Sequence, residues 1–184
     1  KSLISRNNNF NDDRKLAYLL IIATIPIVIA GLLGTDFIES NRNSIASIAY
    51  MNLLFAGFLL FAYIYSASSK SLIELTIAGA IFIGIFQVFA LFPGASRSGT
   101  AMTAALLIGL NLKDSSKFAF LLAIPTIFGA LVFLIGDMVL YETQINIISL
   151  VVGFLTSCIV AFLTIKYFLI FVEKIGMYPF VIYR

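Results

Sequence analysis

Apolar runs about as long as a membrane is thick recur along this chain of 184 residues. Four of them, residues 15–34, 44–66, 114–136 and 145–172, are long enough for a helix to cross a hydrocarbon core about 30 Å thick. Hydrophobic residues make up 61% of the sequence, against roughly 45–50% in soluble domains. Because a backbone inside lipid must satisfy its own hydrogen bonds, these runs predict an all-α, polytopic membrane protein.

A further apolar region is interrupted. Residues 72–92 are helix-like but run into Pro93 and Gly94, and the apolar run that follows, 101–110, is about half the length that spans a membrane. We therefore expect a re-entrant broken pair: one helix enters, residues 93–100 turn inside the membrane, and a short helix returns. Non-helical backbone at that depth is tolerated only where protein buries it or water lines it.

The two ends of the chain read as cuts in a longer protein. Residues 1–14 are polar and asparagine-rich without the order of a signal peptide, which predicts an extramembrane loop. Residues 178–184 stop as if another helix followed. We therefore expect one membrane domain, 1–184, that is a fragment. Asp114 is the expected N-cap of the helix after the broken pair, and Pro125 is an expected kink.

The positions of the charged residues test the broken pair. If residues 1–15 are cytoplasmic and 72–110 enters and returns, the outer loops hold a single basic residue, Arg42, beside four acidic ones, Asp36, Glu39, Asp137 and Glu142. The cytoplasmic segments then hold ten: Lys1, Arg6, Arg14, Lys15, Lys70, Lys113, Lys117, Lys166, Lys174 and Arg184. Such a bias is the positive-inside rule. A full crossing at 72–92 would remove it. The turn of the pair is then expected to open toward the outer face.

The segment 91–100 (LFPGASRSGT) places Arg97 between two serines and two glycines inside this apolar sequence. An intramembrane guanidinium is costly unless it is paired or faces water, so it indicates a functional site. A helix starting near Thr100 would add free backbone amides beside it. Arginine, hydroxyls and helix N-terminal amides together favour a phosphate or diphosphate. The alternative for Arg97 is a structural pair with helix carbonyls or an acid.

Several other chemistries are excluded or weakened by composition. The chain has no histidine, so an imidazole base would have to lie outside it. Cys158 is the only cysteine, which excludes an intrachain disulfide, and we expect it to be a small core residue. A net charge of +3 is too small and scattered to favour nucleic acid. Gln87 either forms a hydrogen bond between two helices or supports the turn at 93–100.

An ordered series of residues resembles a known family. It comprises residues 84–87 (GIFQ), Ala90, Leu91, Pro93, Gly94, 96–99 (SRSG), Gly109, 118–125 (FAFLLAIP), Gly129, Ala130, Ala161, Ile165, Lys166 and the closing 179–184 (PFVIYR). The series resembles the undecaprenyl-pyrophosphate phosphatase family of the bacitracin-resistance type, over its C-terminal two-thirds and without the last helix.

The resemblance implies a fold, an activity and a site. The fold would be two inverted repeats with re-entrant helices. The activity would be hydrolysis of undecaprenyl diphosphate to undecaprenyl phosphate and inorganic phosphate at the outer face of the bacterial cytoplasmic (inner) membrane, recycling the lipid carrier for peptidoglycan synthesis and conferring bacitracin resistance. Mg²⁺ is the expected cation, and lipids and a second copy in a homodimer are the expected partners. The implied catalytic residues are Ser96 and Arg97, and the implied substrate-binding residues are Gln87, Pro93, Gly94, Ser98, Gly99, Thr100 and Thr103.

The sequence departs from the family pattern in ways that bear on activity. The family's first motif, two glutamates followed by two serines and a histidine, is absent, so we expect no metal ligands in this chain and no activity from it alone. Ala101 occupies the usual threonine position, which leaves Thr100 or Thr103 as the substitute hydroxyl. Ser96 and Ser98 remain open between phosphate ligand, nucleophile and helix cap. A polyprenyl-phosphate transporter or flippase and an inactive truncated product are the alternative functions.

Overall fold

The computed structural model describes residues 2–34, 45–66, 69–140 and 146–184. These ranges form α-helices and short 3-10 turns, in the order α1 (Ser2–Leu33), α3 (Ile45–Tyr65), η1 (Leu72–Glu74), α4 (Ile77–Gln87), η2 (Val88–Leu91), α5 (Arg97–Leu107), α6 (Leu112–Leu140), α7 (Ile147–Ile175) and α8 (Tyr178–Tyr183). Within them the only β-type pairing is an isolated bridge between Lys70 and Leu110. The prediction of an all-α protein is confirmed.

Four of the described helices are long and apolar enough to cross a membrane: 12–33, 45–65, 112–136 and 147–175. They lie within or close to the four predicted spans. Their large apolar side chains are mostly exposed, and the last of them buries none of its apolar window inside the protein. Such exposed apolar surface suits contact with lipid, so the polytopic membrane architecture is also confirmed.

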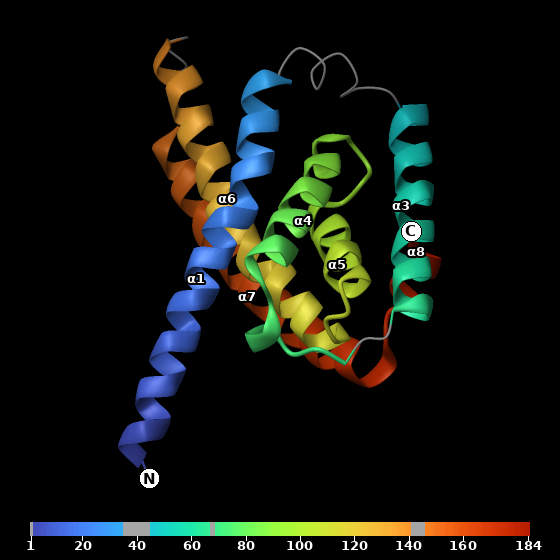
Figure 1. Ribbon diagram of the computed structural model, residues 1–184. Helices are drawn as coiled ribbons and strands as arrows, with labels where there is room; N and C mark the ends of the chain where they lie inside the picture. The colour runs from blue at the N-terminus through green and yellow to red at the C-terminus, as the bar shows by residue number, and fades with distance from the viewer. Residues whose placement is uncertain (1, 35–44, 67–68, 141–145) are drawn as a thin grey trace.

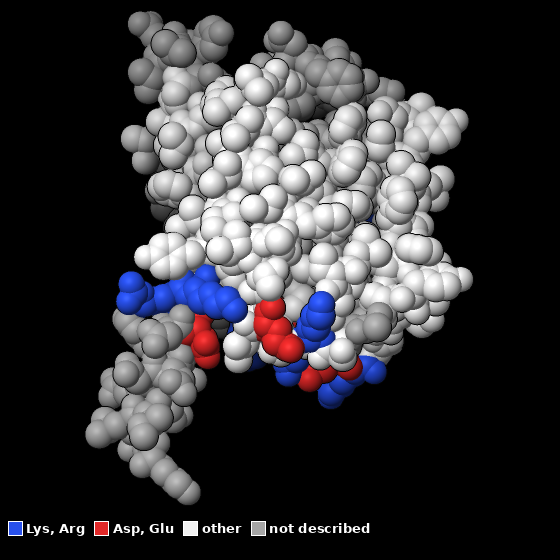
Figure 2. Space-filling model, viewed as in Figure 1, with Lys and Arg blue, Asp and Glu red and all other residues white. Residues whose placement is uncertain are grey.

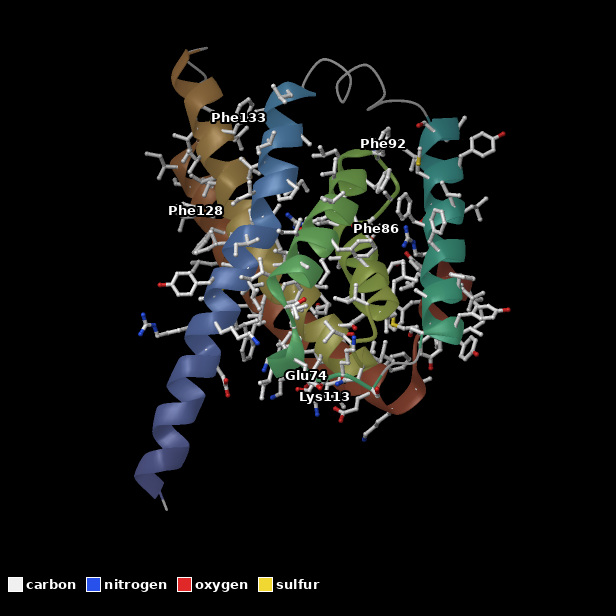
Figure 3. All side chains as sticks on the ribbon, in the orientation of Figure 1. Glu74, Phe86, Phe92, Lys113, Phe128 and Phe133 are labelled. Carbon is white, nitrogen blue, oxygen red and sulfur yellow. The ribbon has the colours of Figure 1, made fainter. Side chains whose placement is uncertain are left out.

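The interrupted region forms a helical hairpin of α4 with η2 and α5. The amide of Lys70 donates to the carbonyl of Gly109 at 3.0 Å, and the amide of Asn111 donates to the carbonyl of Lys70 at 2.9 Å, so both ends of the hairpin lie together. In Figure 3, Glu74 and Lys113 lie at this base and Phe92 lies at the opposite tip. Eleven residues make α5 about 16 Å long, half a bilayer core. The sequence predicts this hairpin, and the second, inverted repeat stays a prediction.

Small residues let the hairpin pack deeply between the long helices. In Figure 1 it lies between α1 and α3 with α6 behind it. Gly84 lies against the backbone of Ala23 in α1, where a Cβ would overlap the Ala23 carbonyl. Residues 99–106 of α5 are all buried. On the other side, Phe55 of α3 packs edge-on against Phe86, with ring centroids 6.2 Å apart. The hairpin is therefore the centre of the described core.

Some local predictions are wrong. Residues 2–14 continue α1 rather than forming a loop. The return helix begins at Arg97, not near 101, because Ser96 caps it. The N-cap of α6 is Asn111 rather than Asp114, since the Asn111 Oδ1 accepts the Asp114 amide at 2.9 Å. Cys158 is exposed on α7 and is not a core residue, so it adds no packing inside the protein.

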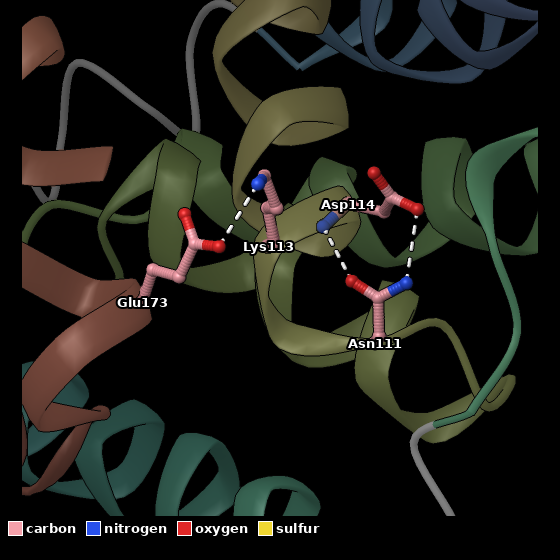
Figure 4. A network of polar contacts seen from close by, with 4 residues as sticks. All are labelled: Asn111, Lys113, Asp114 and Glu173. Atoms are coloured by element: carbon pink, nitrogen blue, oxygen red, sulfur yellow. Dashed lines mark hydrogen bonds and ion pairs between the residues drawn. The ribbon is translucent and has the colours of Figure 1, made fainter. Parts of the chain in front are cut away.

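Charged side chains gather at the end of the molecule where the hairpin base lies (Figure 2). There Lys113 pairs with Glu173 at 2.9 Å, and Asp114 accepts from Asn111 at 2.9 Å (Figure 4). The Leu72 amide also donates to Asp114, at 2.9 Å. The polar turn at 35–43 and Glu142 lie outside the described residues, so the outer-loop charges there are not part of this distribution. This end of the molecule is called the charged base below.

Candidate functional site

The tip of the hairpin is a turn with an unusual backbone. Gly94 has φ 97°, and Ser96, with φ 66° and ψ 112°, is the only non-glycine residue of positive φ in the described ranges. Glycine is required at position 94 both by its positive φ and because a Cβ there would overlap the carbonyl of Ile48 in α3. A non-glycine residue held at positive φ, as Ser96 is, costs about 1–3 kcal/mol and persists where its surroundings fix it.

Ser96 is the N-cap of α5, and the first turn of this helix has backbone amides without intrahelical acceptors. Its Oγ accepts the amide of Gly99 at 3.3 Å, as an N-cap does. The amides of Arg97 and Ser98, the first two residues of the helix, have no intrahelical acceptor. The side chain of Ser96 is exposed, and Ser98 is partly buried. The helix N-terminus thus offers amides and hydroxyls to an anion.

Arg97 lies partly buried at this helix start and lines a cavity of about 460 Å³ between α1, η2 and α6. Apart from Thr126, the other side chains around it are apolar or absent, among them Ile27, Leu91 and Phe133. Its guanidinium makes no hydrogen bond and no ion pair with any residue that the structure describes. The structural alternative for Arg97, a pair with helix carbonyls or an acid, is therefore absent within the described ranges.

Thr100 and Thr103, which are expected to supply a hydroxyl to the substrate, do not line the cavity beside Arg97. Thr100 and Thr103 are both 0% exposed. The Oγ1 of Thr100 donates to the Arg97 carbonyl at 2.9 Å, and that of Thr103 donates to the Gly99 carbonyl at 2.7 Å. Both hydroxyls therefore bond the backbone of α5 itself, and the structure places neither in the cavity beside Arg97.

Gln87 joins two helices near the tip. Its Nε2 donates to the Oγ1 of Thr126 in α6 at 3.1 Å, and its Oε1 is buried without a described partner. This is the helix-to-helix hydrogen bond that the sequence leaves open, and it holds the end of α4 against α6. Gln87 itself is 1% exposed, so its contact with a substrate stays a prediction.

Arg184 is a tip residue that spacing along the sequence does not indicate. The charge pattern groups it with the basic residues of the base, but its Nη2 donates to the carbonyls of Gly94 and Ala95, each at 2.9 Å, so it lies at the tip. The C-terminus lies midway along α3 in Figure 1, far from the charged base. The matching sequence at 179–184 was the available signal, but spacing alone does not bring residue 184 to residue 94.

The described residues do not form a metal site. Within the described ranges no group of three His, Cys, Asp or Glu side chains could hold an ion. Beside Arg97 the cavity offers a cation and apolar groups, which is the wrong donor set for a hard divalent ion. The expectation of no metal ligands in this chain stays a prediction.

Comparison with known proteins gives one consistent family. A family model described as bacitracin resistance protein BacA matches residues 1–184. An undecaprenyl-diphosphatase of Alcanivorax borkumensis is 41% identical over 182 residues, which are 99% of this chain and 69% of that protein. An undecaprenyl-diphosphatase of Saccharophagus degradans is 42% identical over 176 residues, 95% of this chain and 65% of that protein. One of Colwellia psychrerythraea is 42% identical over 175 residues, 94% of this chain and 64% of that protein.

The chain spans about two thirds of the length of these curated relatives. The family match covers residues 1–184 and therefore includes the hairpin, its tip and the C-terminal segment that reaches the tip. The resemblance carried by the ordered series of residues between 84 and 184 is thereby confirmed. The chain belongs to the bacitracin resistance protein BacA family.

Proposed function

We propose that the protein hydrolyses undecaprenyl diphosphate to undecaprenyl phosphate and inorganic phosphate. The observation that carries this proposal is the placement of Arg97, which has no described partner and lies at the N-terminus of α5 on the wall of an otherwise almost wholly apolar cavity. An isolated cation among apolar walls suits a ligand with an anionic head and an apolar tail. The names of the relatives in the comparison state this activity for those proteins.

Size and polarity support the assignment of the two parts of the substrate. A cavity of about 460 Å³ falls in the range of drug-sized pockets, ~300–1,000 Å³. It is therefore large enough for the isoprenoid units next to the diphosphate, and the rest of the C55 chain lies in lipid. The diphosphate faces Arg97, Ser96, Ser98 and the first amides of α5, with Pro93 and Gly94 shaping the turn around it.

The reaction breaks the bond between the terminal phosphorus and the bridging oxygen. Water supplies the oxygen that the terminal phosphorus gains, directly or after transfer to a serine, and the bridging oxygen leaves on the lipid monophosphate. Arg97 donates to non-bridging oxygens and stabilises the negative charge that builds on the leaving phosphate. Ser96 is exposed at the start of the same helix, and its hydroxyl is the one proposed to bind or attack the terminal phosphate.

A divalent cation, Mg²⁺ by the family resemblance, would neutralise further charge on the diphosphate. Because the described residues offer it no ligand set, its ligands belong to residues other than these, and no step above depends on it. The 184 residues by themselves are also expected to release no phosphate, because the sequence holds no histidine and no described carboxylate pairs with Arg97.

The positive-inside rule supports a cytoplasmic position for the charged base. With the base cytoplasmic, the tip opens toward the outer face of the bacterial inner membrane. Hydrolysis there would return the lipid carrier as undecaprenyl phosphate for peptidoglycan synthesis. It would also lower the amount of undecaprenyl diphosphate, which would give bacitracin resistance. Ser96→Cys in a Cys158→Ala background should react with a membrane-impermeant thiol reagent on intact cells. Lys113→Cys at the exposed base should react only after the cells are opened. The opposite labelling pattern would reverse the orientation.

The activity is tested with the purified full-length protein in detergent and undecaprenyl diphosphate as substrate. Release of inorganic phosphate that Arg97→Ala abolishes and Lys113→Ala preserves is the expected result. Transfer of the lipid between leaflets of a vesicle without phosphate release would instead favour a transporter that uses the same anion site. A folded full-length protein that neither releases phosphate nor moves lipid would contradict both functions.

A further inference from the structure

The tip of the hairpin is held from outside the hairpin by Arg184. Besides the two bonds to the carbonyls of Gly94 and Ala95, its Nε donates to the Oδ1 of Asn52 in α3 at 2.7 Å. The Nδ2 of Asn52 returns a bond to the Arg184 carbonyl at 3.1 Å. The pair of Arg184 and Asn52 therefore connects α8, α3 and the turn through four hydrogen bonds.

The turn needs such support because its own backbone forms few hydrogen bonds. The amide of Ala95 bonds the Phe92 carbonyl at 3.2 Å. The carbonyls of Gly94 and Ala95 accept hydrogen bonds from the Arg184 side chain, which lies outside the hairpin. In apolar surroundings an unpaired carbonyl is costly, so without the guanidinium these two groups would pull the turn toward other donors. The positive φ of Ser96 would then relax as well.

Gly99 leaves the space that the guanidinium occupies. A Cβ built on Gly99 would lie 2.8 Å from the Nη1 of Arg184 and 3.2 Å from the Oγ of Ser96. This Nη1 is buried and has no described hydrogen-bond partner. Gly99 is thus needed for close approach of the Arg184 side chain to the first turn of α5, a role beyond the substrate contact expected from the sequence.

We propose that Arg184, paired with Asn52, is a positioning residue that fixes the 93–96 turn so that the first turn of α5 presents Arg97 and Ser96 to the substrate. The presentation of Arg97 and Ser96 to a diphosphate rests on the proposed function. The fixing of the turn by Arg184 and Asn52 does not depend on that function. Arg184 acts through the carbonyls of Gly94 and Ala95 and does not itself need to touch the diphosphate.

The fixing of the turn is measured without any substrate. Ala95 is 0% exposed, so Ala95→Cys in a Cys158→Ala background of the full-length protein reports on opening of the turn through its alkylation rate. Arg184→Ala should raise that rate at least about tenfold, because it removes two charge-assisted bonds to the turn. Arg184→Lys should raise it less, since a lysine keeps the charge but not the fork. Asn52→Ala should also raise it.

The matched control is Tyr183→Ala, a change at the neighbouring residue of the same helix. Tyr183 is 89% exposed, so this substitution tests loss of a side chain from α8 without loss of contact with the turn. It should leave the alkylation rate unchanged. Gly99→Ala approaches the same contact from α5 and should raise the rate by displacing the guanidinium. An Arg184→Ala rate equal to that of the parent would overturn the proposal.

Kinetics separate positioning from general stability. In phosphate release from undecaprenyl diphosphate, Arg184→Ala should lower kcat about tenfold or more, and Asn52→Ala should lower it less. The double variant should lose no more activity than Arg184→Ala, because the two residues act as one unit. Additive losses would contradict a shared role. If the parent releases no phosphate at all, the proposed function fails, and the alkylation rates still decide whether Arg184 fixes the turn.

Discussion

The base and the tip of the hairpin treat their polar groups in opposite ways. At the base, Lys70, Asn111, Asp114 and Lys113 bond neighbouring backbone or acidic groups, and exposed charges face each other. At the tip, Arg97 has no described partner, Ser96 holds a strained φ, and one nitrogen of Arg184 is buried without a partner. The polar groups of the base join helices, whereas several donors at the tip have no partner among the described residues. That difference favours the tip as the candidate site.

The largest expected effect is at Arg97. Arg97→Ala in the full-length protein should lower kcat/KM for undecaprenyl diphosphate by roughly 100-fold or more, as loss of a charge-stabilising donor does. Arg97→Lys should lose about ten- to 100-fold, because a lysine cannot form the two parallel bonds of a guanidinium. Phosphate release is the measurement, with Lys113→Ala at the base as control. A lysine variant that keeps most of its activity while folded would contradict a bidentate role.

A second, smaller effect separates the two roles of Ser96. Ser96→Gly relieves the strain at φ 66° and, as an N-cap change, should cost only a few tenths of a kcal/mol in stability. Ser96→Ala loses the cap without that relief and should cost about 1 kcal/mol, measured by thermal unfolding in detergent. If the hydroxyl binds or attacks phosphate, both variants lose activity alike. A fully active Ser96→Gly would restrict the residue to capping and to shaping the turn.

A third prediction concerns the buried hydroxyl of Thr103. Because it donates to the Gly99 carbonyl and is 0% exposed, Thr103→Val should change the free energy of unfolding by about 1 kcal/mol or less and leave kcat close to that of the parent. The same holds for Thr100→Val. Loss of phosphate release in either variant at unchanged stability would return that hydroxyl to the substrate site that the sequence suggests for it.

The smallest effect is expected at the base. Lys113 and Glu173 are 62% and 53% exposed, so their ion pair is largely screened by solvent. Lys113→Ala or Glu173→Ala should lower stability only slightly, with a smaller effect at high salt, and should not change kcat. A large activity loss from either would mean that the base takes part in the site, which would remove the distinction between the two regions.

Most of the architecture could be predicted from the sequence because it depends on the lengths of apolar runs. The ten-residue run 101–110 is too short to span a membrane, and together with the break at Pro93 and Gly94 and the positions of the charged residues it predicts the hairpin. The start of α5 was misplaced since Ser96 caps the helix from a positive φ, a conformation that no local pattern of a serine indicates. Likewise, the change of N-cap from Asp114 to Asn111 depends on the pairing of Asn111 with Lys70 across the hairpin base.

The candidate site could be predicted only in its contiguous part. Arg97, Ser96 and Ser98 share one helix start, so sequence places them together. Arg184 lies 90 positions from Gly94, and their contact depends on how α8 folds back along α3. The hydroxyls of Thr100 and Thr103 look available in the sequence, but the depth of α5 in the core directs both to the helix backbone. Burial and long-range packing decide these positions, and neither is readable from spacing.

Binding of a non-hydrolysable short prenyl diphosphate analogue to the full-length protein tests the tip most directly, because it needs no turnover. The affinity should fall at least about tenfold in Arg97→Ala, the loss expected for a charge-assisted hydrogen bond. It should stay the same in Lys113→Ala, an equal charge change at the base. Equal affinities of the parent and the folded Arg97→Ala variant would contradict the assignment of the tip as the diphosphate site.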